Sequence, residues 1–207
     1  MVTKQQTPQF GLCLDWETSG ATWGGDSSVD YQGLSFGAIV FDMKTFSPAI
    51  ELYHQIKFNP AKYKWSKEAE AIHGMSQQHL EQNGVTQEEA AADLASLILD
   101  TFGTSKVMFL GHNPGFDIRF TNQLLQTIGI EFSVERSTNA DGWIQLHHVV
   151  LDTSATGMIA LGLFKSDLLF DAIGLEERGA HNALGDARYT LESCARIRLL
   201  VETALNG

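Results

Sequence analysis

Short acidic segments, set in a fixed order along the chain, constrain this sequence more than any other feature. The first is Asp15-Trp16-Glu17, the second runs from Asn113 to Asp117, and the third contains His181 and Asp186. Each lies where the surrounding pattern predicts the end of a strand or the start of a helix. A fold that joins the three segments would gather four carboxylates and one imidazole in one place.

Three strands are predicted in the first part of the chain. Residues 10–17 form an apolar run that ends at the acidic pair, residues 34–41 are apolar on both alternations, and residues 50–58 alternate between apolar and polar side chains. These patterns are typical of a strand, a buried strand and a half-buried antiparallel strand. We expect an antiparallel meander, with a long, flexible, glycine-rich loop at residues 19–33.

Helices and strands alternate in the rest of the chain. Thr86 and Glu89 fit a capping box, which predicts a helix that starts there and ends at Gly103. Asn113 is the expected cap of a second helix, with Pro114 as its first residue. The other expected elements are strands at 107–110 and 144–151, a helix through Met158 and Leu161, and an amphipathic terminal helix from Leu184 to Val201. This order predicts an α/β fold of three layers with a mixed central sheet.

Length and charge restrict the function classes. With 207 residues, we expect a single domain over 1–207, with a flexible start at 1–8. The net charge of −11 argues against a protein that grips long nucleic acid through a broad basic face, and it suits short strands or free ends better. The polar N-terminus is no signal peptide, no stretch can span a membrane, and the two cysteines are expected to be reduced. We therefore expect a cytoplasmic protein without membrane contact.

The acidic pair of the first strand is the first candidate site. Asp15 and Glu17 point to the same face, because side chains two apart in a strand do so. Unpaired, the two carboxylates would repel each other and one pKa would rise, whereas a divalent cation removes this conflict. A solvated strand end is the alternative interpretation of this segment alone.

Asp117 lies in the first turn of its predicted helix, where a carboxylate also stabilises the helix dipole by roughly 0.3–1 kcal/mol. The preceding strand and turn place it beside the edge of the sheet, which favours a role in the same site. Its neighbour Phe116 either stacks on a base or packs in the core.

The last candidate residues are five apart. His181 follows Gly179 and Ala180 in a predicted loop, and Asp186 falls near the start of the last helix. Imidazole is the natural base for activating a water near neutral pH, although a lone histidine is more often structural. Four carboxylates can bind two hard cations, and oxygen ligands favour Mg²⁺ or Mn²⁺ over zinc. The residues therefore predict a two-metal site for phosphodiester hydrolysis.

With these segments the chain resembles the DEDDh branch of the 3′–5′ exonucleases, which have the ribonuclease H-like fold. Asp15-Trp16-Glu17-Thr18 matches the first motif of that family, residues 112–117 match the second, His-Asn-x-x-Phe-Asp, and residues 181–187 match the third, His-x-Ala-x-x-Asp-Ala. Residues 72–75 and 151–153 also resemble recurrent stretches of the family. The match spans almost the whole chain.

The resemblance implies a role for each residue of the motifs. Asp15 would bridge both metal ions, Glu17 and Asp186 would complete the first site, and Asp117 would support the second. His181 would be the general base.

Substrate contacts are expected from four residues, Trp16, Thr18, Asn113 and Phe116. Members of the family often carry Thr-Gly-Leu after the glutamate, with the leucine wedged against the last base. This chain has Thr18-Ser19-Gly20-Ala21 instead, so Trp23 or another residue of the 19–33 loop would have to replace that contact.

The expected function is a 3′–5′ exonuclease that uses two divalent cations on single-stranded DNA or RNA ends or on short oligonucleotides, and releases 5′-mononucleotides. A proofreading or repair subunit that acts mainly with a polymerase or another partner is the alternative. A non-catalytic nucleic-acid-binding module is a third interpretation, and a homodimer is also open.

Overall fold

The computed structural model describes residues 8–22, 24–136, 141–175 and 181–206. Residues 1–7 of the segment expected to be flexible lie outside the described residues, as do Trp23, Gly179 and Ala180. The strands, in chain order, are β1 (Phe10–Thr18), β2 (Gly33–Asp42), β3 (Pro48–Gln55), β4 (Phe109–Gly111), β5 (Ile130–Ser133), β6 (Gly142–Gln145) and β7 (Leu151–Asp152).

Helices connect and cover these strands. In chain order they are α1 (Ser27–Asp30), α2 (Lys67–His73), α3 (Gln77–Asn83), α4 (Gln87–Phe102), α5 (Pro114–Leu125), the 3₁₀ turn η1 (Gln126–Ile128), α6 (Thr153–Leu161), α7 (Ser166–Ala172) and α8 (Ala183–Asn206). None of the helices in the described part of the chain combines the length and apolar character needed to cross a membrane.

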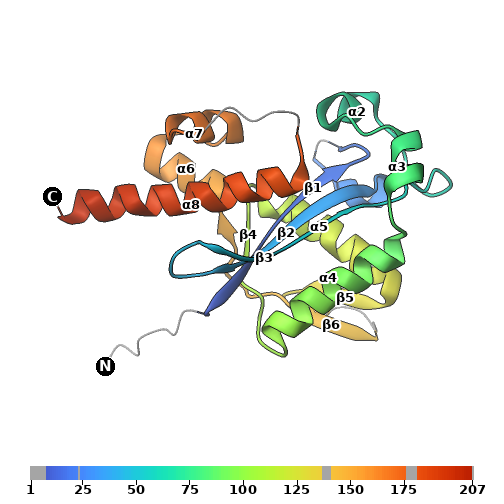
Figure 1. Ribbon diagram of the computed structural model, residues 1–207, viewed down its shortest axis with the longest axis horizontal. Helices are drawn as coiled ribbons and strands as arrows, with labels where there is room; N and C mark the ends of the chain where they lie inside the picture. Colours follow the sequence, from blue (N-terminus) through green and yellow to red (C-terminus); the bar gives the residue numbers. More distant parts are fainter. Residues whose placement is uncertain (1–7, 23, 137–140, 176–180, 207) are drawn as a thin grey trace.

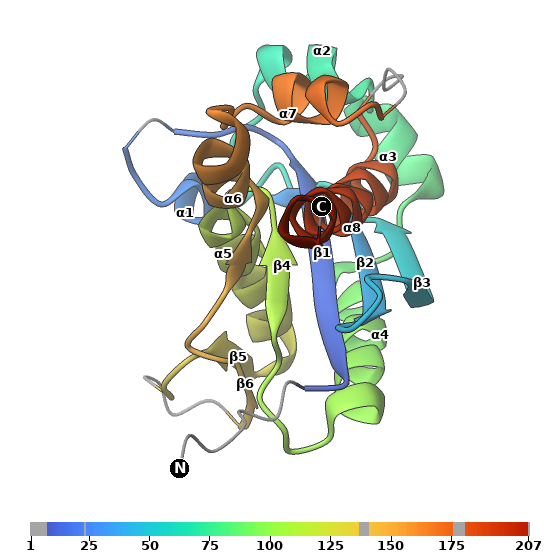
Figure 2. The same cartoon turned by 90° about the vertical axis from the view of Figure 1, so that its left-hand side faces the viewer.

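A five-stranded mixed sheet in the order β3-β2-β1-β4-β7 forms the middle layer. β1 pairs antiparallel with β2 and parallel with β4, and β2 pairs antiparallel with β3. Helix α8 crosses one face of this sheet, whereas α4 and α5 cover the other (Figure 1 and Figure 2). The predicted meander and the predicted three-layer α/β arrangement with a mixed sheet are confirmed.

The side chains of β1 alternate between two cores. Leu14 and Trp16 pack with residues of α4 and α5, whereas Cys13 packs with residues of α8. Burial of one aliphatic side chain of this size contributes about 1.5–3 kcal/mol to folding. Because residues two apart share a face, Asp15 and Glu17 continue the face of Cys13 and lie on the α8 side of the sheet.

The capping box that opens α4 is confirmed. Oγ1 of Thr86 accepts the Glu89 backbone N–H at 3.1 Å, and Oε2 of Glu89 accepts the Thr86 backbone N–H at 2.9 Å. Gly103 caps the other end with a φ of 56°, a backbone conformation that glycine adopts without a steric penalty.

The strand predicted at 144–151 is wrong as a single element. β6 belongs to a separate two-stranded sheet with β5, whereas β7 joins the main sheet beside β4. Between them the chain turns at His147, whose Nδ1 accepts the Val149 backbone N–H at 3.0 Å. An apolar pattern shows that a stretch is buried but not that it passes from one sheet to another.

The described part of the segment 19–33 is mostly loop, as expected, but residues 27–30 form the short helix α1, and the two ends of the segment are joined by a hydrogen bond from the Ser19 backbone N–H to the Gln32 carbonyl at 2.8 Å. Oδ1 of Asp26 accepts the Ser28 backbone N–H at 3.0 Å and caps the short helix. Ser19 and Gln32 are fully buried. Its glycines and polar residues suggested flexibility, but several of these polar groups form buried hydrogen bonds.

The sequence patterns also missed β5, α2, α3 and α7. In addition, the outer half of β3 is more exposed than the predicted half-buried pattern, and Ile50 keeps 49% of its surface accessible. β3 is the edge strand of the main sheet, so its first residues pair with β2 on one side only, and Ile50 stays half exposed.

Candidate active site

A cavity of about 240 Å³ opens where β1 ends, between the first turns of α5 and α8 and helix α7. All five residues predicted to hold metal ions or act as the base line it, namely Asp15, Glu17, Asp117, His181 and Asp186. They come from three distant parts of the chain. The structure therefore brings together the acidic segments that the sequence pattern had selected.

Gly37 of β2 allows the start of α8 to approach the sheet. It pairs with Asp15 in the register of β1 and β2. A Cβ built on Gly37 would lie 2.2 Å from the Cα of Leu184 and 2.4 Å from its backbone nitrogen. Only a residue without a side chain permits this contact, and the contact sets the position of Asp186 in the same turn of the helix.

Three of the site residues form a compact group. Single ligand atoms of Glu17, His181 and Asp186 all lie within 4.8 Å of one another. Nδ1 of His181 is 3.2 Å from Oδ2 of Asp186, which is within ion-pair distance if the imidazole is protonated. Two acidic residues and one imidazole at this spacing can ligate a divalent cation.

The carboxylates of the site are largely removed from water. Glu17, Asp117 and Asp186 keep only 8%, 3% and 7% of their surface accessible. Burial raises the pKa of Asp117 well above its ordinary value, and the charge of Glu17 raises it further, although hydrogen bonds from the backbone of Trp16 and of Asp117 itself oppose the shift. Buried carboxylates of this kind are costly unless a positive charge is close. The donor set and its burial therefore fit divalent cations.

Asn113 stands at the start of α5, but it does not cap the helix with its side chain as predicted. Its φ of 62° and ψ of 54° are left-handed, and its side chain makes no capping hydrogen bond. The backbone N–H of Asn113 instead donates to Oδ1 of Asp152 at 3.2 Å. A non-glycine residue in this conformation costs about 1–3 kcal/mol and is concentrated at functional sites. Asn113 also lines the cavity.

The other three expected substrate contacts differ in position. Phe116 lines the cavity and packs on Phe120, with ring centroids 4.8 Å apart. Trp16 also borders the cavity, but it is 95% buried and its Nε1 donates to Oγ1 of Thr121 at 3.0 Å. Thr18 lies beyond the residues that line the cavity, and its hydroxyl donates to the backbone oxygen of Gly20 at 2.9 Å.

Sequence reasoning missed four residues that line the cavity, His112, Ser166, Phe170 and Thr190. His112 links the end of β4 to the α6–α7 region, because its Nδ1 lies 2.9 Å from Oγ1 of Thr153 and its Nε2 lies 3.1 Å from the backbone oxygen of Phe164. Ser166 and Phe170 belong to α7, which the pattern did not predict. The second motif contains His112, and that was the only available signal.

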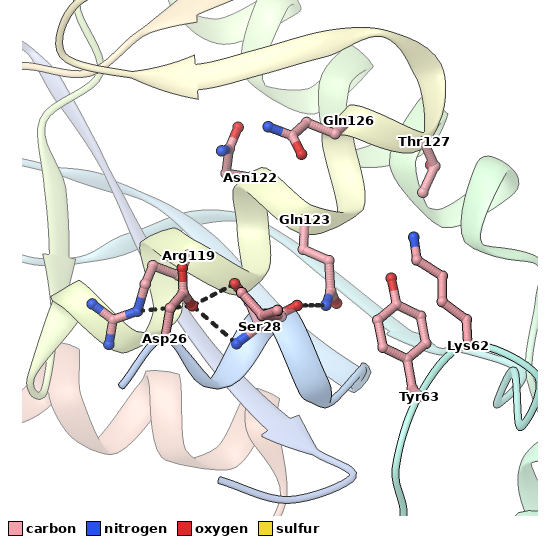
Figure 3. A pocket seen from close by; sticks show the side chains of 10 residues that line it. Asp26, Ser28, Lys62, Tyr63, Arg119, Asn122, Gln123, Gln126 and Thr127 are labelled. Carbon is pink, nitrogen blue, oxygen red and sulfur yellow. Dashed lines mark hydrogen bonds and ion pairs between the residues drawn. The ribbon is translucent and has the colours of Figure 1, made fainter. Parts of the chain in front are cut away.

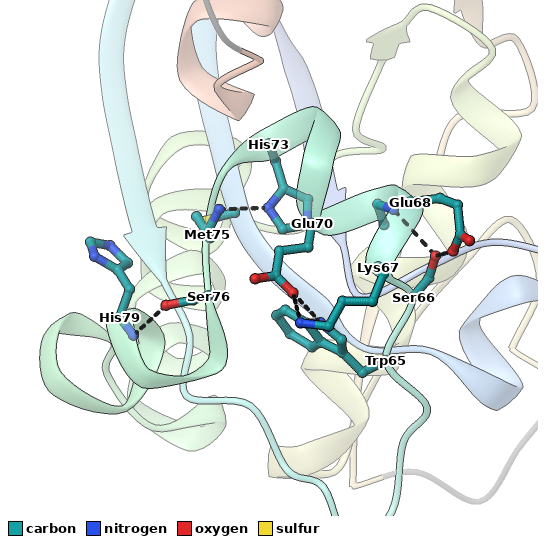
Figure 4. Close-up of polar contacts among 10 residues, drawn as sticks. Trp65, Ser66, Lys67, Glu68, Glu70, His73, Met75, Ser76 and His79 are labelled. Atoms are coloured by element: carbon teal, nitrogen blue, oxygen red, sulfur yellow. Dashed lines mark hydrogen bonds and ion pairs between the residues drawn. The ribbon is translucent and has the colours of Figure 1, made fainter.

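His73, at the end of α2, is a further buried histidine, and Figure 4 shows it beside Met75 and Glu70. Its Nδ1 accepts the Met75 backbone N–H at 3.0 Å, and its buried Nε2 lies near the Thr18 carbonyl without reaching full hydrogen-bond geometry. Burial lowers the pKa of His73 and the charge of His181 adds to this, whereas the Thr18 carbonyl and Glu70 oppose it. The backbone N–H of Ser66, the N-cap of α2, donates to the Ser19 carbonyl at 2.7 Å, so α2 begins against the end of β1.

This chain resembles known exonucleases in both sequence and structure. The exonuclease family model RNase_T matches residues 12–193. A search of curated proteins found no match. E. coli exonuclease I in complex with a dA16 oligonucleotide has a TM-score of 0.70 at 19% identity, over 93% of this chain and 41% of that chain.

Two further structures are similar at low identity. Exonuclease I from Methylocaldum szegediense has a TM-score of 0.68 at 18% identity, over 92% of this chain and 40% of that chain. A 3′-exonuclease that recognises the 3′ end of the histone mRNA stem-loop has a TM-score of 0.65 at 12% identity, over 96% of this chain and 84% of its own. This chain thus spans less than half of the exonuclease I chains. The likenesses confirm the expected ribonuclease H-like fold.

The order of the three motifs, their meeting in one cavity and the family match agree with one another. Because the family model covers residues 12–193 of 207, this chain belongs to the RNase_T exonuclease family, as its resemblance to the DEDDh-type 3′–5′ exonucleases predicted.

Proposed function

We propose that this protein is a metal-dependent 3′–5′ exonuclease that hydrolyses phosphodiester bonds at the 3′ ends of single-stranded DNA or RNA and releases 5′-mononucleotides. The observation that carries the proposal is the convergence of Glu17, His181 and Asp186, from opposite ends of the chain, within 4.8 Å of one another. Membership of the exonuclease family supports this chemistry.

Two divalent cations fit the carboxylates of the cavity. Asp15, Glu17 and Asp186 would hold one cation, and Asp117 would support a second, with Asp15 shared between them. Carboxylate oxygens are the ligands that Mg²⁺ and Mn²⁺ prefer. When bound, such cations supply an activated water and stabilise negative charge on the leaving 3′ oxygen.

His181 is the proposed general base. In the cavity it would accept the proton of the attacking water, a role that typically accelerates hydrolysis by about 10²–10⁴-fold. Its side chain is 40% exposed, so the ring is accessible to a water molecule in the cavity. The neighbouring carboxylate of Asp186, 3.2 Å away, would stabilise the imidazolium that forms.

The terminal nucleotide is proposed to lie against α5. The half-buried ring of Phe116 lines the cavity and would offer a stacking surface for the last base, and Asn113 stands next to it. Trp16 would form the floor beneath them, and Thr18 would hold the end of β1 in place. The complex of exonuclease I with an oligonucleotide supports a single-stranded substrate.

A digest of end-labelled oligonucleotides tests the proposal. With Mg²⁺ or Mn²⁺, 5′-labelled DNA or RNA should shorten stepwise from its 3′ end, and EDTA should stop the reaction. Asp15→Asn should lower the rate by at least about 100-fold, because it weakens binding of both cations. Glu88→Gln, an exposed change of the same kind on α4, is the matched control. An Asp15→Asn protein as active as the control would refute the proposal.

The alternative, a subunit that acts mainly in complex with a polymerase or another partner, is favoured by exposed apolar side chains on α6 and α8. Ile159 and Leu205 keep 88% and 79% of their surface accessible. Sedimentation of the purified chain, combined with its specific activity alone, separates the two functions. A homodimer would be detected in the same experiment.

A further inference from the structure

A second cavity lies on α5, beside the candidate active site. It has a volume of about 540 Å³ and is lined by α1, the last turns of α5 and η1, and the segment around Lys62 and Tyr63. Figure 3 shows Asn122 and Gln126 on one side and Lys62 and Tyr63 on the other. We name this cavity the α1–α5 pocket.

The segment 19–33 builds this pocket by docking on two neighbours. The side chain of Gln123 on α5 donates from Nε2 to the backbone oxygens of Ser28 and Tyr31, and its Oε1 accepts the Gly33 backbone N–H at 3.2 Å. On its other side, Nζ of Lys64 donates to Oδ1 of Asp30 at 2.9 Å. These contacts fix the walls of the pocket before any ligand arrives.

Helix α5 connects the pocket to the active site. Its first turn carries Phe116 at the catalytic cavity, and Gln126, ten residues later, lines the α1–α5 pocket. Ten residues of helix rise about 15 Å, which equals about four nucleotides of a stacked strand at ~3.4 Å each, and fewer of an extended one.

Arg119 lies between the two cavities. It lines the α1–α5 pocket, yet its Nη1 lies only 3.7 Å from the point where a Cβ on Gly115 would stand, in the first turn of α5. Its Nε is 3.4 Å from Oδ1 of Asp26, so one acidic group of the pocket is already neutralised.

Lys62 adds a second positive charge at the far side of the pocket. It forms no ion pair within the described residues, and its ammonium group lies 4.9 Å from the centroid of the Tyr63 ring. Asp26 offsets the charge of Arg119, so the pocket keeps the single positive charge of Lys62, in a chain whose net charge is −11, and this charge favours an anion there.

We infer that the α1–α5 pocket binds an upstream nucleotide of the same strand whose 3′ end enters the catalytic cavity, with Arg119 and Lys62 contacting its phosphates. The side-chain amides of Asn122 and Gln126 and the Tyr63 hydroxyl supply polar contacts for its base or sugar. The segment 19–33 takes part by forming one wall of this pocket, through Asp26, Ser28 and Val29. The inference rests on the proposed exonuclease function.

Kinetics on substrates of two lengths test this inference. The wild-type protein should have a lower KM for an oligothymidylate octanucleotide than for the dinucleotide, because only the longer strand reaches the pocket. Lys62→Glu should raise the octanucleotide KM by about fivefold or more and leave the dinucleotide kinetics unchanged. It should also make the slope of log binding constant against log salt concentration less steep by about one. Lys106→Glu, an exposed lysine without an ion pair in the described chain, carries the same charge change away from the pocket.

A binding measurement without catalysis separates this inference from the function itself. Anisotropy of a labelled octanucleotide in EDTA should show weaker binding by Lys62→Glu and by Gln126→Ala than by Lys106→Glu. If the wild-type protein digests oligonucleotides but Lys62→Glu and Lys106→Glu behave alike, the pocket is refuted while the function stands. If the wild-type protein digests nothing yet its binding depends on Lys62, the function fails while the pocket remains.

Discussion

Gly37 in β2 and Leu184 at the start of α8 are in backbone contact, so close that a Cβ on the glycine would lie 2.2 Å from the Leu184 Cα. This contact joins the strand next to β1 to the helix that carries Asp186. The distance between the first and last acidic segments of the site therefore depends on a glycine outside every catalytic motif.

Gly37→Ala should move the first turn of α8 away from the sheet. The atoms that a methyl group would meet belong to the backbone, so no side chain can rotate to make room. We expect a loss of stability of about 1–3 kcal/mol and a fall in kcat of more than tenfold at saturating Mg²⁺. Thermal unfolding and steady-state kinetics measure the two effects.

Gly25→Ala is the control for this change. Gly25 has an ordinary backbone conformation, and a Cβ there would come no nearer than 3.4 Å to its closest neighbour. This variant should keep wild-type stability and kcat within experimental error. A Gly37→Ala protein with an unchanged kcat would show that the α8 contact does not position the site.

Asp117→Asn should stabilise the metal-free protein at neutral pH while it removes activity. The pKa of Asp117 is raised in the folded state, mainly by burial, so the folded protein holds the proton at pH values where the unfolded chain has lost it. The free energy of unfolding therefore falls as pH rises through that interval. Removing the charge should raise stability by about 1 kcal/mol, or Tm by roughly 2–4 °C.

With metal added, the wild-type protein should become more stable than Asp117→Asn, the reverse of the order without metal. Mn²⁺ at a hundredfold excess over its Kd stabilises a binding protein by about 2.7 kcal/mol, and Asp117→Asn lacks one ligand. Differential scanning calorimetry with EDTA and with Mn²⁺ measures both states. An asparagine variant that is less stable without metal would contradict the proposed cost of the buried carboxylate.

Local signals in the sequence were sufficient for much of this fold. The capping box of Thr86 and Glu89 and the alternation of β1 depend on neighbours within a few residues, and both are present in the structure. The acidic pair, Asp117 and the third motif were found because each lies at an element end, and all of them line one cavity.

Features that depend on distant contacts could not be predicted in the same way. The left-handed backbone of Asn113 follows from its bond to Asp152, thirty-nine residues later. The position of the segment 19–33, with its short helix α1, depends on hydrogen bonds to Gln123. Phe170 lines the cavity only because α7 folds over it. Periodic patterns in the sequence describe neighbours along the chain and do not predict which distant residues will be in contact.

His73→Phe should flatten the pH dependence of stability below neutrality. Burial lowers the pKa of His73 in the folded state, so the unfolded chain binds a proton first as pH falls. The contribution of the neutral His73 to stability is therefore fully present above the unfolded pKa of about 6.5. It is lost as pH falls below that value, by up to about 1.4 kcal/mol per pH unit for this one group.

Urea unfolding of wild type and His73→Phe between pH 7.5 and pH 5 measures this difference. The variant should be less stable at pH 7.5 by about 1–3 kcal/mol, because the Met75 backbone N–H loses its acceptor. The two curves should then converge as pH falls. Parallel curves over the whole range would show that His73 does not charge on unfolding.

Gln123→Leu should release the segment 19–33 from α5. The side-chain amide of Gln123 makes three hydrogen bonds to backbone groups of that segment, and leucine of similar size makes none. The unsatisfied backbone groups should cost about 1–3 kcal/mol. Hydrogen exchange of the Gly33 amide should become faster, and octanucleotide binding in EDTA should weaken. Gln126→Leu, one turn along, has no such bonds within the described chain, so equal exchange in the two variants would rule out the anchoring role of Gln123.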